Sequence, residues 1–399
     1  MAALAATSAL ACLAIQPTAA AASAARSAGS VTLAPAKPVT ARTAVPAPPA
    51  VHSAQGGSLM ASHGIVVHYP NRAAPRLPNV PASAFVIANA STGQVLAAKD
   101  PHGKFGPAST MKVLTAITLI PLLKPNAMVM ASKRAAETEP NDAGLVAGIQ
   151  YRVSDLFTAL LTISANDAAV ALAEATGSFA KGMTLINDEA RHLQAYDVVA
   201  KQPNGLPAAG QVESAYDEAL IARQALAMPA FMKYDSTLTA KFEVKPHHWE
   251  TLVNQNWLLT KYPGGIGGKI GWTISSEATY IGLARRHGVT LIVTIMHCTS
   301  LQEITSAVKL LNWGFAMNGK VNPVGVLVPP LATADAAARQ RSGAATTKPV
   351  ADAADVRPSG SGSNTAAYVV AAAAVLAAAV GVAGLTWRRR RVAAARRLQ

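Results

Sequence analysis

Residues 107–120 read PASTMKVLTAITLI, a short polar stretch that leads directly into apolar residues at helical spacing. This pattern predicts a helix that begins near Ser109 and packs into a core. Ser109 and Lys112 are three positions apart, so their side chains share one face of that helix and can meet. A serine hydroxyl becomes a strong nucleophile when a nearby base takes its proton, and a lysine with a lowered pKa can be that base. Taken alone, however, this spacing is more often a serine N-cap followed by a solvated lysine.

Two further motifs change the balance between these interpretations. Ser164 and Asn166 follow one apolar helical stretch and precede another, which places a hydroxyl and an amide at a turn between two helices. Residues 269–273 read KIGWT and come directly after the glycine-rich residues 264–268. They are expected to form a strand in which Gly271 lets a ligand approach the backbone closely.

The segments around these motifs predict a mixed α/β (α+β) fold. Residues 83–99 and 279–296 each have the pattern of a β-hairpin. Apolar residues recur at helical spacing after residue 301, and helical patterns dominate residues 111–226. The expected architecture is an antiparallel sheet flanked by helices, with a helix-rich subdomain.

The motifs Ser-x-x-Lys, Ser-x-Asn and Lys-x-Gly thus occur in this order within one α/β segment. In this arrangement the chain resembles the penicillin-recognising serine enzymes, and most closely the D-alanyl-D-alanine carboxypeptidase family of low-mass penicillin-binding proteins. The resemblance extends over nearly all of residues 76–319 and includes residues 203–206 and 214–217. It implies the fold of the β-lactamases and transpeptidases.

The resemblance also implies catalytic roles for three residues. Ser109 corresponds to the nucleophile that is acylated, and Lys112 to the group that takes its proton. Ser164 corresponds to the hydroxyl that relays a proton to the leaving amine. The positive charge of Lys269 would help to keep Lys112 neutral, because each lysine lowers the affinity of the other for a proton.

Five residues are implied to bind the substrate. Asn166 corresponds to the amide that hydrogen-bonds the substrate backbone, and Lys269 to the cation that faces the substrate carboxylate. The backbone N–H groups of Ser109 and Trp272, the latter directly after Gly271, would form the oxyanion hole. Thr273 offers a hydroxyl on the same strand.

One position departs from the family pattern. The residue between the lysine and the glycine is usually Thr or Ser, whose hydroxyl hydrogen-bonds the terminal carboxylate, but here it is Ile270. The loss of one charge-assisted hydrogen bond costs about 1.5–3 kcal/mol, which is roughly a 10- to 100-fold loss of turnover. Ile270 therefore leaves two possibilities open, a working enzyme and an impaired one.

Composition argues against a nucleic-acid partner. The 399 residues carry 35 Lys+Arg and 21 Asp+Glu, a formal charge of +14, but residues 76–319 are nearly balanced with 20 basic and 18 acidic residues. The excess charge lies in the terminal segments, a pattern typical of targeting and membrane-flanking sequence. The two cysteines, Cys12 and Cys298, make no zinc site, and neither His247-His248 nor His297 has a third ligand at metal-binding spacing, so we expect no metal and no cofactor.

The two terminal segments of the sequence predict a protein that is exported and anchored in a membrane. Residues 366–387 form an uncharged apolar run of about 33 Å at helical rise, and four arginines follow at once, which predicts a single transmembrane helix with a cytoplasmic C-terminus and an extracytoplasmic catalytic domain. The expected organisation is a signal-like segment (1–25), a Pro/Ala-rich linker (26–75), the catalytic domain (76–319), a second linker (320–365), the transmembrane helix (366–387) and an Arg-rich tail (388–399).

The resemblance implies removal of the terminal D-Ala from peptidoglycan stem peptides, with β-lactams as covalent inhibitors. Two alternatives stay open. A β-lactamase would share the site, but the E-x-x-L-N run typical of class A does not occur between Asn166 and Lys269. A wall-binding homologue that lost turnover through Ile270 is the other.

Overall fold

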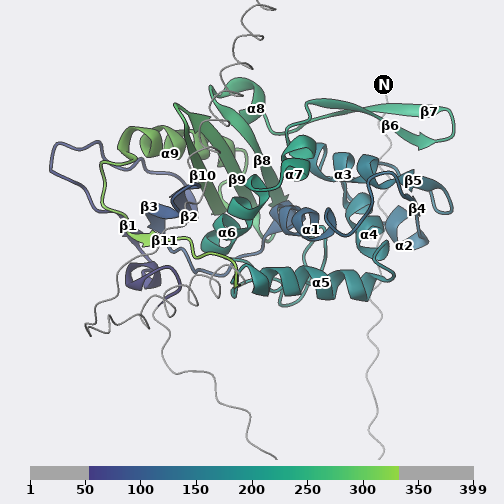
Figure 1. Cartoon of the computed structure of the whole chain (residues 1–399), viewed down its shortest axis with the longest axis horizontal. Helices are drawn as coiled ribbons and strands as arrows, with labels where there is room; N and C mark the ends of the chain where they lie inside the picture. Colours follow the sequence, from purple (N-terminus) through teal and green to yellow (C-terminus); the bar gives the residue numbers. More distant parts are fainter. Residues whose placement is uncertain (1–53, 332–399) are drawn as a thin grey trace, which may run out of the picture. The chain divides into compact units, whose positions relative to one another are not determined.

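The computed structural model describes residues 54–331, and these residues form the mixed α/β fold predicted from the sequence (Figure 1). A seven-stranded antiparallel sheet has the order β1-β3-β2-β10-β9-β8, and β11 also pairs with β3. Its strands are β1 (Ile65–Val66), β2 (Ala82–Asn89), β3 (Gln94–Lys99), β8 (Gly265–Thr273), β9 (Glu277–Arg286), β10 (Val289–Cys298) and β11 (Gly325–Val326).

Both predicted hairpins are confirmed. β2 pairs with β3 around a turn at Gly93, whose φ of 76° lies in the region that glycine adopts most easily, and β9 pairs with β10 around Gly288. The central strand β10 joins the two hairpins, with Phe85 opposite Ile295. Residues 290–296 of β10 are all buried, because helices cover both faces of the sheet, and this explains why apolar residues do not alternate with exposed polar ones along the strand.

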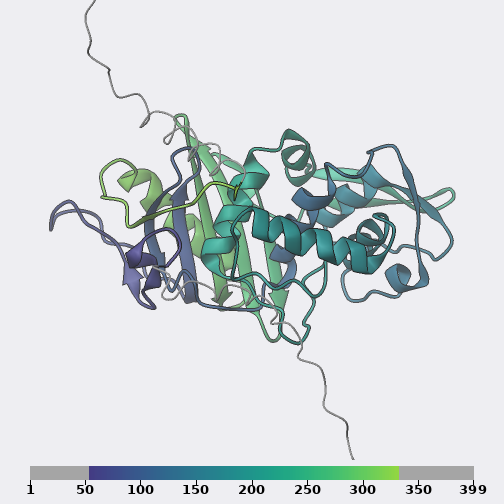
Figure 2. The same ribbon diagram turned by 60° about the horizontal axis from the view of Figure 1, so that its bottom comes forward.

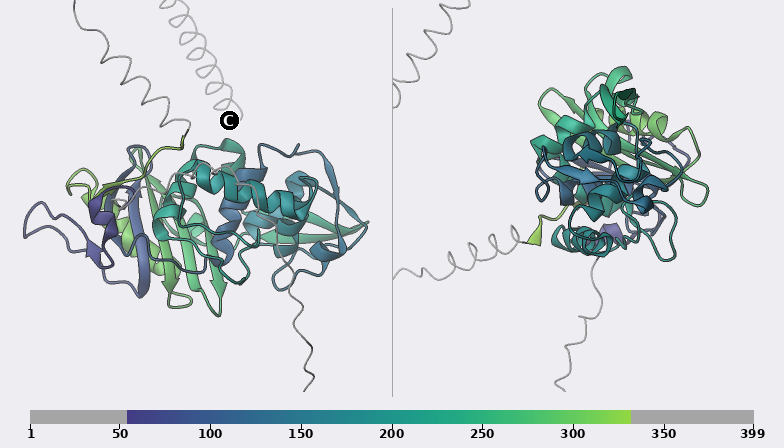
Figure 3. Two further views of the ribbon diagram at one scale, coloured as in Figure 1. Left: turned by 90° about the horizontal axis from the view of Figure 1, so that it is seen from below. Right: turned by 90° about the vertical axis from the view of Figure 1, so that its right-hand side faces the viewer.

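Alternate residues of the sheet enter two separate cores. One core packs Phe85 and Ile295 against α9 (Glu303–Met317) and α8 (Leu258–Lys261). The other packs Val86 and Ile292 against α6 (Ala215–Leu226) and the helical region. The period-2 alternation of strand side chains therefore places the two cores on opposite faces of the sheet. Figure 3 gives two further views of the sheet and its helices.

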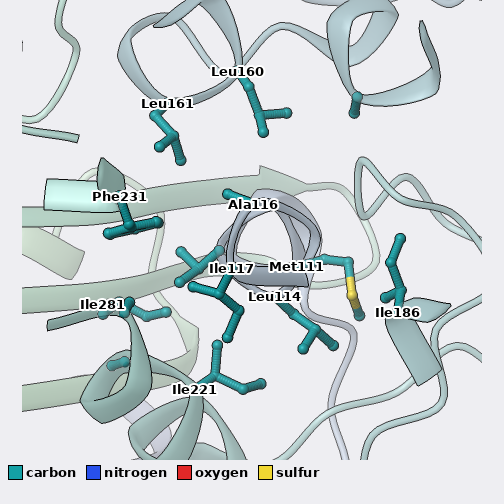
Figure 4. Packing of buried hydrophobic residues seen from close by; sticks show 14 of the residues in the cluster. Met111, Leu114, Ala116, Ile117, Leu160, Leu161, Ile186, Ile221, Phe231 and Ile281 are labelled. Carbon is teal, nitrogen blue, oxygen red and sulfur yellow. The ribbon is translucent and has the colours of Figure 1, made fainter. Parts of the chain in front are cut away.

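The helix that follows Ser109 lies at the centre of the helical region. All nine residues of α1 (Met111–Leu119) are buried. Figure 4 shows its side chains surrounded by Leu160, Ile186, Ile221 and Phe231, which come from four other helices. The longest of these, α5, crosses the front of Figure 2. The surrounding helices are α2 (Lys133–Ala136), α3 (Val153–Thr162), α4 (Asn166–Glu174), α5 (Phe179–His192), α6 and α7 (Pro229–Asp235), and the 3-10 turns are η1 (Ser58–Ala61) and η2 (Ala108–Thr110).

Two small two-stranded antiparallel sheets were not predicted from the sequence. β4 (Met128–Met130) pairs with β5 (Gln150–Arg152), and β6 (Thr239–Lys245) pairs with β7 (His248–Val253). The first pair has only three residues in each strand, too few to show a period. Most residues of the second pair are not buried, so its apolar signal is weak. His247 lies at the turn between β6 and β7 with a φ of 64°.

The folded part extends past residues 76–319 at both ends. β1 and β11 share the edge of β3 that β2 leaves free, although they fall in the predicted linkers 26–75 and 320–365. Strands of two residues carry no periodic signal, so the sequence could not reveal them. Within residues 54–331, none of the helices has the length and apolar character needed to cross a bilayer, and the segments 1–25, 366–387 and 388–399 lie outside the described residues.

The packing of α9 on the sheet can be tested with one pair of variants. Leu310 lies on the face of α9 that packs on the sheet and is fully buried, whereas its neighbour Lys309 is exposed. Leu310→Ala is expected to lower the free energy of unfolding by about 2–5 kcal/mol, because it leaves a cavity. Lys309→Ala should change it by less than about 0.5 kcal/mol. Urea unfolding measures both, and equal losses would contradict the assigned packing.

Candidate active site

Lys112 makes hydrogen bonds to three different segments of the chain at the site. Its Nζ lies 2.7 Å from each of three acceptors, Ser109 Oγ, Asn166 Oδ1 and the carbonyl oxygen of Asn204. A charged ammonium donates all three of its protons to them. When the amine is neutral it has two protons to donate, and its lone pair can then accept the hydroxyl proton of Ser109. The same geometry therefore accommodates both states of a proton transfer between Ser109 and Lys112.

The surroundings of Lys112 favour the neutral amine. The side chain is fully buried, and this burial lowers its pKa well below the ordinary value. The positive charge of Lys269 lowers the pKa further, while the carboxylate of Asp167 acts in the opposite direction. Lys112 therefore has the property that a general base needs near neutral pH.

The turn before α1 holds Ser109 against the sheet. Ala108 has a φ of 49°, and the carbonyl oxygen of Pro107 accepts a hydrogen bond of 2.8 Å from Thr279 Oγ1 on β9. Gly271 of β8 lies beside this turn, and a Cβ atom added there would come within 2.7 Å of the Ser109 backbone nitrogen. Glycine is required at this position because the strand passes too close for a side chain.

The turn between α3 and α4 is held by two residues that the sequence did not single out. Asn166 donates from Nδ2 to the carbonyl oxygen of Pro140, and its backbone N–H donates to Asn141 O at 2.9 Å. Asn141 Nδ2 in turn donates to Ser164 O at 2.9 Å. Ser164 has a φ of 64°, and its buried Oγ has no hydrogen-bond partner within the described chain. This hydroxyl is therefore available to a bound molecule.

Lys269 lies on β8, the strand that the sequence predicted. Its side chain is only 2% exposed, and Nζ donates to its neighbour's carbonyl oxygen, Ile270 O, at 2.7 Å. Burial lowers the pKa of Lys269 to about 7, although the charge of buried Asp235 opposes the shift. Asp235 itself has its pKa raised by burial to about 7, and it accepts a 2.7 Å hydrogen bond from Gly268 N. The Lys269 side chain is thus almost completely covered by protein, and its role in binding a substrate carboxylate stays a prediction.

Residues of all three sequence motifs line one cavity of about 330 Å³. Six of the residues expected at the site line it, and Lys112 and Lys269 lie behind its wall. The lining is Ser109, Pro140, Asn141, Ser164, Asn166, Gly205, Leu206, Gln255, Ile270, Gly271, Trp272, Thr273, Leu301 and Glu303. Thr273 Oγ1 accepts a hydrogen bond of 3.0 Å from Ser276 N, so its hydroxyl is engaged within the strand end.

One cluster elsewhere brings together three groups that could ligate a metal. His102, Asp197 and Asp217 offer atoms within 4.8 Å of one another. His102 Nδ1 lies 2.7 Å from Asp197 Oδ2, and Nε2 lies 3.0 Å from Gln55 O. Burial alone would lower the pKa of His102, but these two hydrogen bonds and the negative charges of Asp197 and Asp217 together outweigh it and raise the pKa. Since both ring nitrogens face acceptors, the geometry fits a doubly protonated imidazolium better than a metal ligand.

Comparison with known proteins decides the family. The model of the D-alanyl-D-alanine carboxypeptidase family matches residues 71–300, which is more than half of the chain. The chain belongs to this family. A relative is the D-alanyl-D-alanine carboxypeptidase DacB2 of Mycobacterium tuberculosis, 34% identical over 248 residues that cover 61% of this chain and 85% of DacB2. DacF of Bacillus subtilis is 28% identical over 59% of this chain, which spans only 62% of the length of DacF.

Solved structures of the family have the same fold. The structure of a D-alanyl-D-alanine carboxypeptidase from Mycobacterium tuberculosis superposes with a TM-score of 0.61 at 33% identity, over 65% of this chain and 99% of that one. The DD-transpeptidase of Streptomyces K15 superposes with a TM-score of 0.58 at 27% identity, over 61% of this chain and 100% of that one. The antiparallel sheet with its helices is therefore the transpeptidase-like fold that the resemblance implied.

The electrostatic coupling of the two buried lysines predicts a measurable shift. Lys269→Gln removes the positive charge that lowers the pKa of Lys112, so the pKa of Lys112 is expected to rise while staying below the ordinary value because the side chain is still buried. NMR titration of the Lys112 side chain measures this change. Lys261→Gln, at an exposed lysine of α8, is the control and should leave the titration unchanged. An unchanged pKa in Lys269→Gln would contradict the coupling.

Proposed function

We propose that the chain is a serine-type carboxypeptidase that removes the terminal D-Ala from peptidoglycan stem peptides through an acyl-enzyme on Ser109. The observation that carries this proposal is the 2.7 Å hydrogen bond between buried Lys112 and Ser109 Oγ at the wall of the cavity. Membership of the D-alanyl-D-alanine carboxypeptidase family supports the choice of substrate.

The mechanism that we propose uses the contacts of the site. Neutral Lys112 takes the proton of Ser109 as Oγ attacks the carbonyl carbon of the penultimate D-Ala. The Ser109 backbone N–H, in the 3-10 turn η2 directly before α1, would stabilise the oxyanion that develops. Ser164 Oγ, free of other partners within the described chain, gives its proton to the leaving amine and takes the proton that Lys112 had accepted, so terminal D-Ala departs and Lys112 is neutral again. Water then hydrolyses the ester and restores the Ser109 hydroxyl.

Substrate orientation is the role that we assign to Asn166 and β8. Asn166 is fixed by its hydrogen bonds with Lys112 and Pro140, so it presents a rigid polar wall to a bound peptide. Gly271 keeps the opposite wall, β8, close to Ser109. A β-lactam would enter the same cavity as a substrate mimic and acylate the same hydroxyl.

The nucleophile can be tested by labelling with a fluorescent penicillin. The native chain is expected to form a covalent adduct that survives denaturing electrophoresis, and Ser109→Ala should form none, because no other hydroxyl contacts Lys112 in the described site. Ser236→Ala changes an exposed serine after α7 and is the matched control. Equal labelling of Ser109→Ala and the native chain would refute the assignment.

One observation favours a second candidate, a wall-binding homologue with little turnover. Ile270 lines the cavity with an apolar side chain, and the neighbouring ammonium of Lys269 is shielded. The part of the cavity wall around Ile270, which would contact a terminal carboxylate, therefore offers that carboxylate few hydrogen-bond donors.

This candidate makes its own prediction. If the missing hydroxyl limits the reaction, Ile270→Thr should raise D-Ala release from a D-Ala-D-Ala peptide roughly 10- to 100-fold, the effect of one charge-assisted hydrogen bond. Ile270→Val has nearly the shape of Thr without the hydroxyl and should not raise it. Efficient release by the native chain would exclude the impaired homologue.

The cellular location proposed here rests on the sequence alone. Residues 366–387 and the arginines that follow favour a single membrane anchor, with the folded residues on the extracytoplasmic side, where the cell wall lies.

A further inference from the structure

A second cavity lies beside α6. It has a volume of about 410 Å³, and its walls come from α6, from β9 and β10, and from the turn after β2. Val328, Pro329 and Pro330, near the end of the described residues, form another part of the wall. This cavity has the size of a small-molecule site and shares no lining residue with the cavity at Ser109.

The charge of this second cavity is positive. Its charged lining residues are Arg223 on α6 and Arg285 on β9, and no aspartate or glutamate of residues 54–331 lines it. Neither arginine forms an ion pair with a carboxylate of the described chain. Because two like charges that line one cavity repel each other, a bound anion would relieve this repulsion.

Arg285 keeps most of its hydrogen-bond donors for a ligand. Its Nε donates to Thr290 Oγ1 at 2.9 Å, across the pair of strands β9 and β10. Neither Nη1 nor Nη2 of Arg285 donates a hydrogen bond to another of the described residues. The planar guanidinium presents such donors as a fork that matches two oxygens of one anion.

Arg223 is held in place by backbone atoms of two segments. Its Nε donates to Ala90 O at 2.9 Å, its Nη2 to Ser91 O at 3.3 Å and its Nη1 to Leu327 O at 2.9 Å. A guanidinium has more N–H groups than these bonds use, so Arg223 still has donors for a ligand. Its fixed position means that little conformational entropy is lost when the ligand binds.

A phosphate ester fits two guanidinium groups better than a carboxylate does. One arginine can satisfy both oxygens of a carboxylate, whereas a phosphate monoester has three terminal oxygens and a charge of roughly −2. Part of the lining is apolar and includes Leu220, Leu226 and Val328. An organic group attached to the phosphate would contact these side chains.

We infer that Arg223 and Arg285 form a binding site for the phosphate group of an organic phosphate ester, which is either a soluble molecule or the head group of a lipid. The bound phosphate would link α6 and β9 to the C-terminal residues of the described chain, because Arg223 is already bonded to Leu327 O. This site goes beyond the proposed function, since none of its residues takes part in the chemistry at Ser109.

A pair of small ligands isolates the phosphate group. Calorimetry on the full chain in a non-ionic detergent measures the binding of sn-glycerol 3-phosphate and of glycerol. Only the phosphate ester is expected to bind, and its dissociation constant should rise with the salt concentration, because salt screens the attraction between the ester and the arginines.

Three variants assign this binding to the cavity. Arg285→Gln should weaken it roughly tenfold or more, the effect of one charge-assisted hydrogen bond, and Arg285→Lys keeps the charge and should weaken it less. Arg152→Gln, at an exposed arginine of β5 that faces Asp155, is the matched control and should leave the affinity unchanged. Thermal unfolding of each variant checks that the fold is intact.

Photolabelling distinguishes the two sources of the phosphate. The full chain is placed in vesicles that contain phosphatidylglycerol with a photoreactive acyl chain. A lipid source predicts labelling within residues 220–227 or 328–330 that is lost in Arg285→Gln. A soluble source predicts no such labelling, while sn-glycerol 3-phosphate still binds to the native chain.

Three results would overturn the phosphate site. They are no binding of sn-glycerol 3-phosphate, equal binding of glycerol, and an unchanged affinity in Arg285→Gln. Penicillin labelling of Ser109 tests the proposed function separately, and Arg285→Gln is expected to be labelled as the native chain is, because the two cavities share no lining residue.

Discussion

The buried amino group of Lys112 is the constraint on which the rest of the site depends. An amine removed from water needs hydrogen-bond partners in the protein in both of its protonation states, and Lys112 finds them on three separate segments, at Ser109, Asn166 and Asn204. Each acceptor must therefore be held rigidly. The surrounding core of α1 and its neighbouring helices provides that rigidity, because close-packed interiors resist small displacements.

Close backbone contacts bring the sheet and the helical region together around the same turn. A Cβ atom at Gly271 would crowd Ser109 N from the side of β8, and one at Gly205 would collide with Ala108 O from the other side. The turn that contains Ala108 and Ser109 is thus confined between Gly205 and Gly271. This confinement accounts for the left-handed conformation of Ala108, which the surrounding structure maintains against its steric cost.

The features that could be predicted from the sequence are those that leave a local pattern of residues in it. The hairpins of residues 83–99 and 279–296 show alternating or continuous apolar runs between turn residues, and Ser109 meets Lys112 because helical spacing requires it. Contacts made through backbone atoms, such as the Asn204 carbonyl, have no signature in residue type. The exposure of a side chain is equally hidden, since it depends on which distant segments cover it.

These limits explain the remaining differences. The sequence does not show that the Lys269 side chain is buried, or that Glu303, 34 positions further along the chain, lines the same cavity. The pairing of β11 with β3 has a mechanical consequence. A force pulling on the chain beyond Leu331 would load first the hydrogen bonds at Pro329 O and Val328 N, and then the two-residue strand β11. These contacts would peel away before the tension reached β2 and β10, so the cavity would keep its shape under load.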